Sequence, residues 1–365
     1  MAVDPPFLLP EAQQAIKVIE AGVIRLEKNI PLPPVGEEDV LVRVHCVALN
    51  PFDWKSLDLS PAAGSTHGCD VSGEIVAVGS KCRQDLRVGD RVLGPVKGNF
   101  SDGLDNGGFA QFAAIHQLMV WHVPEGMPFA QAATLGLSLM TVGLALHYML
   151  QVQLPLAAGE SDSPGDYVFI YGGGRHFGNS DCCAVSQGLG GSGMQVVCAA
   201  SPRHFERLKL LGAAACFDYH LATVGEDVRK FTNGRLTKAL DCITDSASMS
   251  ICYEALGDQG GRYVGLDQFP IRSHTRRDVL PEWILAWTVF GEAIRWKRPY
   301  AKAPRPKHKI FAEQWQPVVQ KLLDAGLLAT HPMDLRSGGL GAIPEGIDML
   351  RKGKTEGRKL VYSVV

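Results

Sequence analysis

Asn50-Pro51-Phe52-Asp53-Trp54-Lys55 directly follows an apolar run from Val40 to Leu49. The run alternates apolar and polar side chains at its start, a pattern typical of a half-buried β-strand. Beyond it come residues 68–79, GCDVSGEIVAVG, and residues 88–92, VGDRV. The six residues therefore bring a carboxylate and a cation to the end of a predicted strand, and they contain no cysteine.

This order of segments resembles the catalytic domain of the medium-chain dehydrogenase/reductases. In the zinc alcohol dehydrogenases of that superfamily, a metal-binding cysteine stands where this chain reads Pro51-Phe52-Asp53-Trp54-Lys55. Here an aspartate and a lysine replace the ligand, so the resemblance implies a zinc-free reductase with no metal site. It implies an α/β fold that combines a GroES-like, partly open β-barrel with a Rossmann-type doubly wound parallel sheet.

The composition is that of an ordinary globular protein with room for two domains. The chain has 365 residues, 46% of them apolar and 20% charged, and a net charge of −2; one hydrophobic core rarely serves so long a chain. We expect no nucleic-acid partner, because such proteins usually present a basic face. Gly, Pro or His breaks the longest apolar runs before about 18 residues, so we expect no membrane span. The N-terminus lacks a signal-peptide pattern, and the nine cysteines contain no CxxC pair, which favours reduced thiols and a cytoplasmic location.

Two patterns divide the chain. From residue 12 to about 115 the segments are short and strand-like, beginning with a predicted hairpin at 15–19 and 23–26 and ending with a strand at 107–113. From residue 129 onward, helical pieces alternate with strands at 166–171, 194–200, 215–219, 239–243 and 261–266, as in a dinucleotide-binding domain. We predict a GroES-like domain at 1–130 and a Rossmann domain at 131–299. The resemblance implies that residues 300–365 complete the first domain.

The first strand of the second domain ends in Tyr171-Gly172-Gly173-Gly174, a turn suited to the pyrophosphate of a dinucleotide. Backbone N–H groups at the start of the next helix would bind the phosphates. A lone glycine-rich run is equally typical of an ordinary loop. Its place after one buried strand and before another favours the cofactor.

The end of the next strand, Ser201-Pro202-Arg203-His204, indicates NADPH rather than NADH. An acidic side chain here would bind the ribose 2′-hydroxyl and repel a 2′-phosphate. This chain offers a hydroxyl, a guanidinium and an imidazole instead. The alternative is that Ser201 only caps the helix that starts at Pro202.

Lys55 is the candidate catalytic residue. Hydride addition to an enoyl thioester builds an enolate, and a cation near its oxygen lowers the barrier. In the resemblance this segment lies beside the nicotinamide, where Lys55 would contact the cofactor ribose or the substrate carbonyl. The alternative is a structural ion pair of Lys55 with Asp53. His45 and His67 can donate protons, but a lone histidine is more often structural, and we assign neither.

Four segments are similar to the fungal trans-acting enoyl reductases: residues 139–146 (LMTVGLAL), 201–205 (SPRHF), 240–244 (LDCIT) and 288–292 (TVFGE). Those stand-alone enzymes serve highly reducing polyketide synthases, including polyketide–peptide hybrids, whose own reductase domain is inactive. The resemblance implies a monomeric enzyme that reduces α,β-unsaturated polyketide intermediates on the carrier protein of such a synthase. A free-standing quinone or enone reductase and a cofactor-defective binding protein are the alternatives.

The resemblance also implies two sets of site residues. NADPH would contact Phe52, Asp53, Trp54, Lys55, Gly174, Arg175, His176, Phe177, Ser201, Pro202, Arg203, His204, Tyr219, Leu266, Asp267, Thr355 and Glu356. The acyl chain would contact Leu139, Met140, Thr141, Val142, Gly143, Leu144, Ala145, Leu146, Thr288, Val289, Phe290, Gly291 and Glu292. The acyl segments are mostly apolar and would equally suit a plain core. At Asp267 the family usually has a neutral amide, so the acid here would weaken cofactor binding.

Residues 174–193 depart from the family pattern. A Rossmann helix should begin here, yet the segment has six glycines and little periodicity, and each glycine costs a helix about 1 kcal/mol relative to alanine. Codons for His176 to Gly191 exist for which the next reading frame encodes TSATLTVAQFLKASG, an amphipathic helix that opens with hydroxyl residues. Our hypothesis is a reading-frame or splice error in the gene sequence; the alternative is a genuine loss that weakens NADPH binding.

Overall fold

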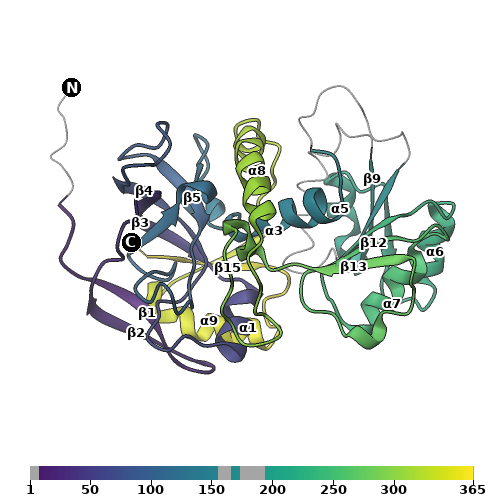
Figure 1. Cartoon of the computed structure of the whole chain (residues 1–365), viewed down its shortest axis with the longest axis horizontal. Helices are drawn as coiled ribbons and strands as arrows, with labels where there is room; N and C mark the ends of the chain where they lie inside the picture. The colour runs from purple at the N-terminus through teal and green to yellow at the C-terminus, as the bar shows by residue number, and fades with distance from the viewer. Residues whose placement is uncertain (1–7, 155–165, 173–193, 365) are drawn as a thin grey trace. The chain divides into compact units, whose positions relative to one another are not determined.

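The computed structural model describes residues 8–154, 166–172 and 194–364 (Figure 1). Contacts divide the chain into two compact units, residues 1–137 with 332–365 (unit 1) and residues 138–331 (unit 2). The return to unit 1 begins at Pro332, whereas the sequence analysis expected it near residue 300. The difference arises because helix α8 (Pro306–Asp324) packs against η2 (Gly143–Met149) and η5 (Ala286–Phe290), which belong to unit 2.

Unit 1 is built on a mostly antiparallel sheet in the order β14-β15-β3-β4-β5-β7, in which β6 also pairs with β3, and on a separate β1-β2 hairpin. Its strands are β1 (Gln13–Glu20), β2 (Val23–Ile30), β3 (Asp39–Ala48), β4 (Asp70–Val78), β5 (Arg91–Pro95), β6 (Phe112–His116), β7 (Trp121–His122), β14 (Met333–Arg336) and β15 (Lys359–Ser363). Its helices are α1 (Pro51–Leu59), η1 (Gln117–Met119), α2 (Phe129–Ala132), η6 (Gly339–Ala342) and α9 (Ile343–Arg351). The predicted hairpin and the long strand of residues 40–49 are confirmed.

The core of unit 1 follows the two-residue period of its strands. Val40, Val42 and Val44 of β3 are fully buried and share one hydrophobic cluster with Ile343 and Ile347 of α9. Burying a branched aliphatic side chain contributes about 1.5–3 kcal/mol. The core thus holds α9 and the strands together, and it leaves the carboxyl end of β3 to lead into α1.

Unit 2 contains a six-stranded parallel sheet in the order β10-β9-β8-β11-β12-β13. Its strands are β8 (Tyr167–Tyr171), β9 (Gln195–Ala200), β10 (Ala215–Asp218), β11 (Lys238–Asp241), β12 (Gly261–Gly265) and β13 (Val279–Trp283). Its helices are η2, η3 (Pro202–His204), α5 (Phe205–Leu210), α6 (Val224–Phe231), α7 (Ser246–Ala255), η4 (Ile271–Ser273), η5 and α8, and α3 (Gly136–Val142) crosses the boundary between the units. The buried sides of α6 and α7 share a core with β8, β9, β11 and β12, and Figure 1 shows both helices beside that sheet. The predicted Rossmann sheet is confirmed, and its strand order reverses at β8, where open α/β sheets bind ligands at the strands' carboxyl ends.

One helical stretch is longer and more apolar than the sequence analysis allowed. Residues Phe129–Met149 form 21 helical residues with a mean hydropathy of 1.6, enough by length and composition to cross a membrane. The residues of its most apolar window are 89% buried inside the protein. A hydrophobic helix that is buried in this way is typical of a protein core.

Candidate active site

Residues Phe52 to Lys55 form the first turn of helix α1. Asn50 is the N-cap, Pro51 takes the first helical position, where no N–H is needed, and Asp53 Oδ2 accepts a hydrogen bond of 2.6 Å from the Asn50 N–H. Lys55 is half-buried, and its Nζ lies 6.0 Å from the centre of the Trp54 ring. The candidate lysine therefore belongs to a regular, capped helix rather than to a loop.

A buried carboxylate fixes the start of that helix. Asp70 is fully buried; its Oδ2 accepts hydrogen bonds from Asn50 Nδ2 at 2.9 Å and from Lys359 Nζ at 2.8 Å, and its Oδ1 accepts from the Leu137 N–H at 2.5 Å. Lys359 also donates to the Thr134 carbonyl at 2.7 Å. Asp70 thus joins the start of α1, strand β15 and the start of α3 through charge-assisted hydrogen bonds.

Burial changes the protonation of two groups below α1. It raises the pKa of Asp53 to about 7, against the hydrogen bond from the Asn50 N–H, which lowers it. It lowers the pKa of His67 to about 4, so that His67 is neutral at physiological pH. His45 stacks on Phe129 with 4.4 Å between ring centres, and burial lowers its pKa as well. The proton donor stays unassigned.

The structure brings the first turn of α1 and the turn after α9 onto neighbouring elements of unit 1. The guanidinium of Arg351, the last residue of α9, donates two hydrogen bonds of 2.9 and 2.8 Å to the carboxylate of Asp58 in α1. Four residues further on, Thr355 is buried and Glu356 is exposed with a φ of 50°. Both predicted cofactor segments of unit 1 therefore depend on this clamp between α1 and α9.

The predicted cofactor residues of unit 2 follow the carboxyl ends of parallel strands. Ser201 to His204 come directly after β9, Tyr219 after β10, and Leu266 with Asp267 after β12. The Tyr219 ring lies edge-on to that of Tyr171 at 6.4 Å. These residues therefore share one edge of the sheet.

The chemistry at this edge fits a dinucleotide. Gly172, after β8, has a φ of 85°, and a Cβ there would lie 2.9 Å from the Ile243 side chain, so only glycine suits the turn. Arg203 is exposed, and its Nε donates to His204 Nε2 at 3.2 Å; burial, Arg203 and Arg207 together lower the pKa of His204. A tight turn followed by a hydroxyl and a guanidinium is a set of groups that phosphates bind.

Two predicted features need separate comment. Asp267 Oδ1 accepts hydrogen bonds from the Tyr300 hydroxyl at 2.9 Å and from the Gln268 N–H at 2.7 Å, so its charge is partly compensated. Gly174, Arg175, His176 and Phe177 lie outside the described residues. So does the segment of the reading-frame hypothesis.

The two predicted acyl segments meet at helix α8. Residues 139–146 lie in α3 and in the π-helix η2 and are buried throughout; the Leu139 carbonyl accepts a hydrogen bond of 2.9 Å from Trp315 Nε1. A Cβ on Gly143 would come within 2.3 Å of that indole, so the close packing requires glycine. Thr288, in η5, hydrogen-bonds His308 Nδ1 of α8 at 2.7 Å. Phe290 and Gly291 are half-buried and Glu292 is exposed.

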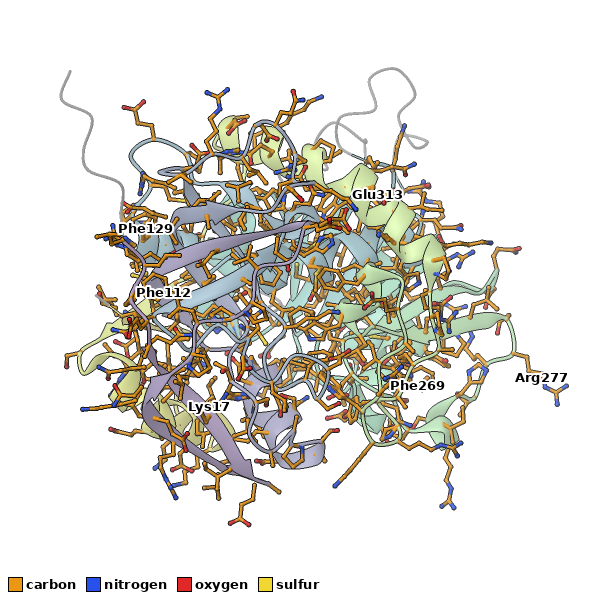
Figure 2. The ribbon with its side chains drawn as sticks, turned by 60° about the vertical axis from the view of Figure 1, so that its left-hand side comes forward. Lys17, Phe112, Phe129, Phe269, Arg277 and Glu313 are labelled. Carbon is orange, nitrogen blue, oxygen red and sulfur yellow. The ribbon has the colours of Figure 1, made fainter. Side chains whose placement is uncertain are left out.

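The sequence analysis missed α8, although two signals mark it. Pro306 stands at its first position, and Phe311, Trp315, Val319 and Leu322 recur at the spacing of one helix face. Figure 2 labels Glu313 on this helix, whose apolar face includes Trp315. These side chains form the packing partner of both acyl segments.

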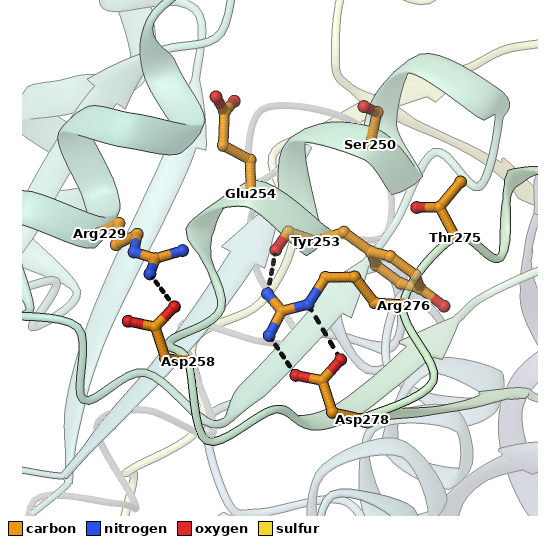
Figure 3. Close-up of a pocket in the computed structure, with 8 residues that line it drawn as sticks. All are labelled: Arg229, Ser250, Tyr253, Glu254, Asp258, Thr275, Arg276 and Asp278. Atoms are coloured by element: carbon orange, nitrogen blue, oxygen red, sulfur yellow. Dashed lines mark hydrogen bonds and ion pairs between the residues drawn. The ribbon is translucent and has the colours of Figure 1, made fainter.

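A pocket of about 540 Å³ lies elsewhere in unit 2 (Figure 3). Arg276 donates to the carbonyls of Tyr253, Leu256 and Gly257 and pairs with Asp278, and Arg229 pairs with Asp258. The pocket sits at the end of α7 and before the start of β13, away from the carboxyl ends of the strands. Within residues 8–154, 166–172 and 194–364, no group of three or more His, Cys, Asp or Glu side chains is arranged to hold a metal ion.

Comparison with known proteins agrees with this architecture. Residues 36–125 match the family described as Alcohol dehydrogenase GroES-like domain. The chain is similar in structure to the CurK enoyl reductase (TM-score 0.74, 19% identity, 96% of this chain and 99% of that one). It is also similar to a putative zinc-dependent alcohol dehydrogenase protein from Rhizobium etli CFN 42 (TM-score 0.77, 20% identity, 97% and 98%). At these identities the likeness shows the fold, and it confirms the predicted combination of GroES-like and Rossmann domains.

Full-length relatives narrow the family. The chain is 45% identical over 363 residues to the trans-enoyl reductase opdC of Penicillium oxalicum, covering 98% of both chains. It is 42% identical over 367 residues to the trans-enoyl reductase iccB of Talaromyces variabilis, covering 98% of this chain and 97% of the relative. The chain therefore belongs to the fungal trans-enoyl reductases, oxidoreductases of the medium-chain dehydrogenase/reductase superfamily that use a nicotinamide cofactor.

Proposed function

We propose that this enzyme reduces the α,β-double bond of polyketide thioesters carried by a highly reducing polyketide synthase or a polyketide–peptide hybrid, with NADPH as the cofactor. The observation that carries the proposal is the full-length identity of 42–45% to several trans-enoyl reductases. Bound NADPH supplies a hydride to the β-carbon. The remaining tasks fall to residues of this chain.

Lys55 is the residue to which we assign charge stabilisation. Reduction places negative charge on the thioester oxygen, and a fixed cation at that point stabilises the transition state more than the ground state. The capped helix α1, tied to Asp70 through Asn50, gives the lysine a fixed backbone. This rigidity favours a preorganised catalytic role.

The preference for NADPH rests on the segment after β9. It has Ser201 and Arg203 but no carboxylate that would repel a 2′-phosphate. Asp218, at the end of the neighbouring strand β10, hydrogen-bonds His220 at 2.6 Å. The exposed Arg203 is therefore the group that we assign to the 2′-phosphate.

A monomeric enzyme is supported by the outer strand of the Rossmann sheet. The N–H of Ile284 bonds Gly265 and the carbonyl of Asp278 bonds Gly261, so the even-numbered residues between them face β12. The odd-numbered residues, with Pro281 in the middle, face outward. Proline has no N–H for a further strand, and nature uses it to block the pairing of edge strands.

Isotope transfer tests the proposed function. The purified enzyme is mixed with NADPH deuterated at nicotinamide C4 and with a crotonyl thioester on a phosphopantetheinylated carrier domain. We expect a butyryl product with one deuterium at the β-carbon, and at least tenfold lower kcat/KM with NADH. Reduction of benzoquinone without reduction of the thioester would show a quinone reductase, and no binding of either cofactor would show a binding protein.

A further inference from the structure

Positive charge is concentrated in one short part of unit 2. Seven Lys and Arg residues fall within residues 295–309 (RWKRPYAKAPRPKHK), which contain no Asp or Glu, in a chain whose net charge is −2. This density differs from the mixed charges of an ordinary solvated surface. We refer to residues 292–309 as the basic loop.

The backbone closes the basic loop on the second acyl segment. Ile294 and Lys302 exchange two backbone hydrogen bonds of 2.9 and 3.0 Å, and the Arg305 N–H donates to the Gly291 carbonyl at 3.0 Å. At the loop's end, His308 bonds the Thr288 hydroxyl. The loop therefore begins and ends at residues 288–292, which we assign to the acyl chain.

The charges of the loop converge and point outward. Arg295, Arg298, Arg305 and Lys307 are exposed, and none of them forms a salt bridge with a carboxylate in the part of the chain that the structure describes. Lys302 lies 3.2 Å from the centre of the Trp283 ring. Burial and the nearby Arg305 lower the pKa of Lys302 to about 8, with Glu282 acting in the opposite direction, and burial, Arg305 and Lys302 lower that of His308 to about 4. The positive field is thus strong enough to act on its own neighbours.

We propose that the basic loop is the docking surface for the carrier domain that delivers the substrate. The partner that fits is a small protein with an acidic face whose prosthetic arm adds the negative charge of a phosphodiester. Arg295, Arg298 and Lys307 attract that face, while the acyl end of the arm extends toward residues 288–291 at the loop's base. Such steering raises the association rate and weakens with salt. The proposal rests on the proposed function, since it names how the same substrate arrives.

Charge reversal tests the docking surface. We compare the wild type with a variant carrying Arg295→Glu, Arg298→Glu and Lys307→Glu. The matched control carries Arg272→Glu, Arg277→Glu and Lys321→Glu, three exposed cations elsewhere in unit 2; Figure 2 shows Arg277 projecting from the surface. Binding is measured by fluorescence anisotropy with a labelled, phosphopantetheinylated carrier domain of the polyketide synthase encoded nearest to this gene, at low and high NaCl. Activity is measured on the crotonyl thioester of that domain and on crotonyl-N-acetylcysteamine.

We expect the triple reversal to weaken carrier binding and to raise the KM for the carrier-bound substrate at least tenfold. The control variant and the turnover of crotonyl-N-acetylcysteamine should stay within about twofold of the wild type. Equal binding by wild type and reversal variant, or no saturable binding by the wild type, overturns the proposal. Tighter, reversal-sensitive binding to a 20-base-pair DNA duplex or to phosphatidylglycerol vesicles also overturns it. A wild type that binds the carrier but reduces neither thioester refutes the proposed function and leaves the docking result standing.

Discussion

Lys359 Nζ lies 2.8 Å from Asp70 Oδ2, and the two side chains are only 3% and 0% exposed. The pair joins positions that are 289 residues apart in the sequence. Because Asp70 also binds Asn50 at the start of α1, the C-terminal strand β15 helps to set the position of the helix that carries Lys55. The end of the chain thus contributes to the candidate site without supplying a catalytic group.

Replacing Lys359 should destabilise unit 1. Lys359→Met leaves the buried Asp70 carboxylate without its cation, a change that typically costs about 3–5 kcal/mol. We expect a lower urea midpoint and faster hydrogen exchange in α1 and β15. Lys321→Met, at an exposed position in α8, is the control and should change stability by less than about 0.5 kcal/mol. Equal midpoints for the two variants would contradict this role for the pair.

Asp53 should make stability depend on pH. Its pKa is about 7 in the folded protein, against an ordinary value of 3.8, so the folded state holds a proton that the unfolded state has released. The stabilisation is complete below about pH 4 and is lost as the pH rises through 7. Asp53→Asn keeps an acceptor for the Asn50 N–H but does not titrate. We therefore expect the unfolding free energy of the variant, relative to wild type, to increase by about 2–4 kcal/mol from pH 4 to pH 8. A difference that does not change with pH would refute the buried, protonated carboxyl.

Local patterns predicted the elements that have their own periodicity. The hairpin, strand β3 and the strands β8 to β12 follow from alternation or from continuous apolar runs between turns. Helix α1 was missed, although Asn50, Pro51 and Asp53 form a helix start signal, because attention fell on the missing cysteine. The Asp70–Lys359 pair could not be foreseen, since nothing local relates residues 289 positions apart.

Lys55 should affect turnover more than substrate binding. Lys55→Met removes the cation assigned to the developing enolate, and the loss of one such interaction typically lowers kcat about 10²-fold. Lys55→Arg should recover part of that loss because it keeps the charge. Steady-state kinetics on a carrier-bound crotonyl thioester measure both, with Lys81→Met, at a 65% exposed side chain, as the control. A change confined to KM would assign Lys55 to binding instead.

Arg203 should determine the choice between the two nicotinamide cofactors. A hydrogen bond to a charged group is worth about 1.5–3 kcal/mol, so Arg203→Ala should lower kcat/KM for NADPH about 10- to 100-fold. The value for NADH should change little, because NADH has no 2′-phosphate. Arg272→Ala, which alters an exposed arginine elsewhere in unit 2, is the matched control. Equal losses with both cofactors would mean that Arg203 supports the edge of the sheet and does not read the phosphate.

Residues 176–191 should limit cofactor affinity if the gene sequence contains a frame error. Replacing them with TSATLTVAQFLKASG restores hydroxyl groups after the Tyr171-Gly172-Gly173 turn and an apolar period of three to four residues, the features that a phosphate-binding helix start requires. We expect the NADPH dissociation constant, from fluorescence titration, to fall at least tenfold relative to the printed chain. A scrambled insert of the same composition should give no gain, because it keeps the residues but loses the period. Sequencing of the transcript is the independent check: a transcript that encodes the printed residues, in a protein that binds NADPH as tightly as the replaced variant, excludes the frame error.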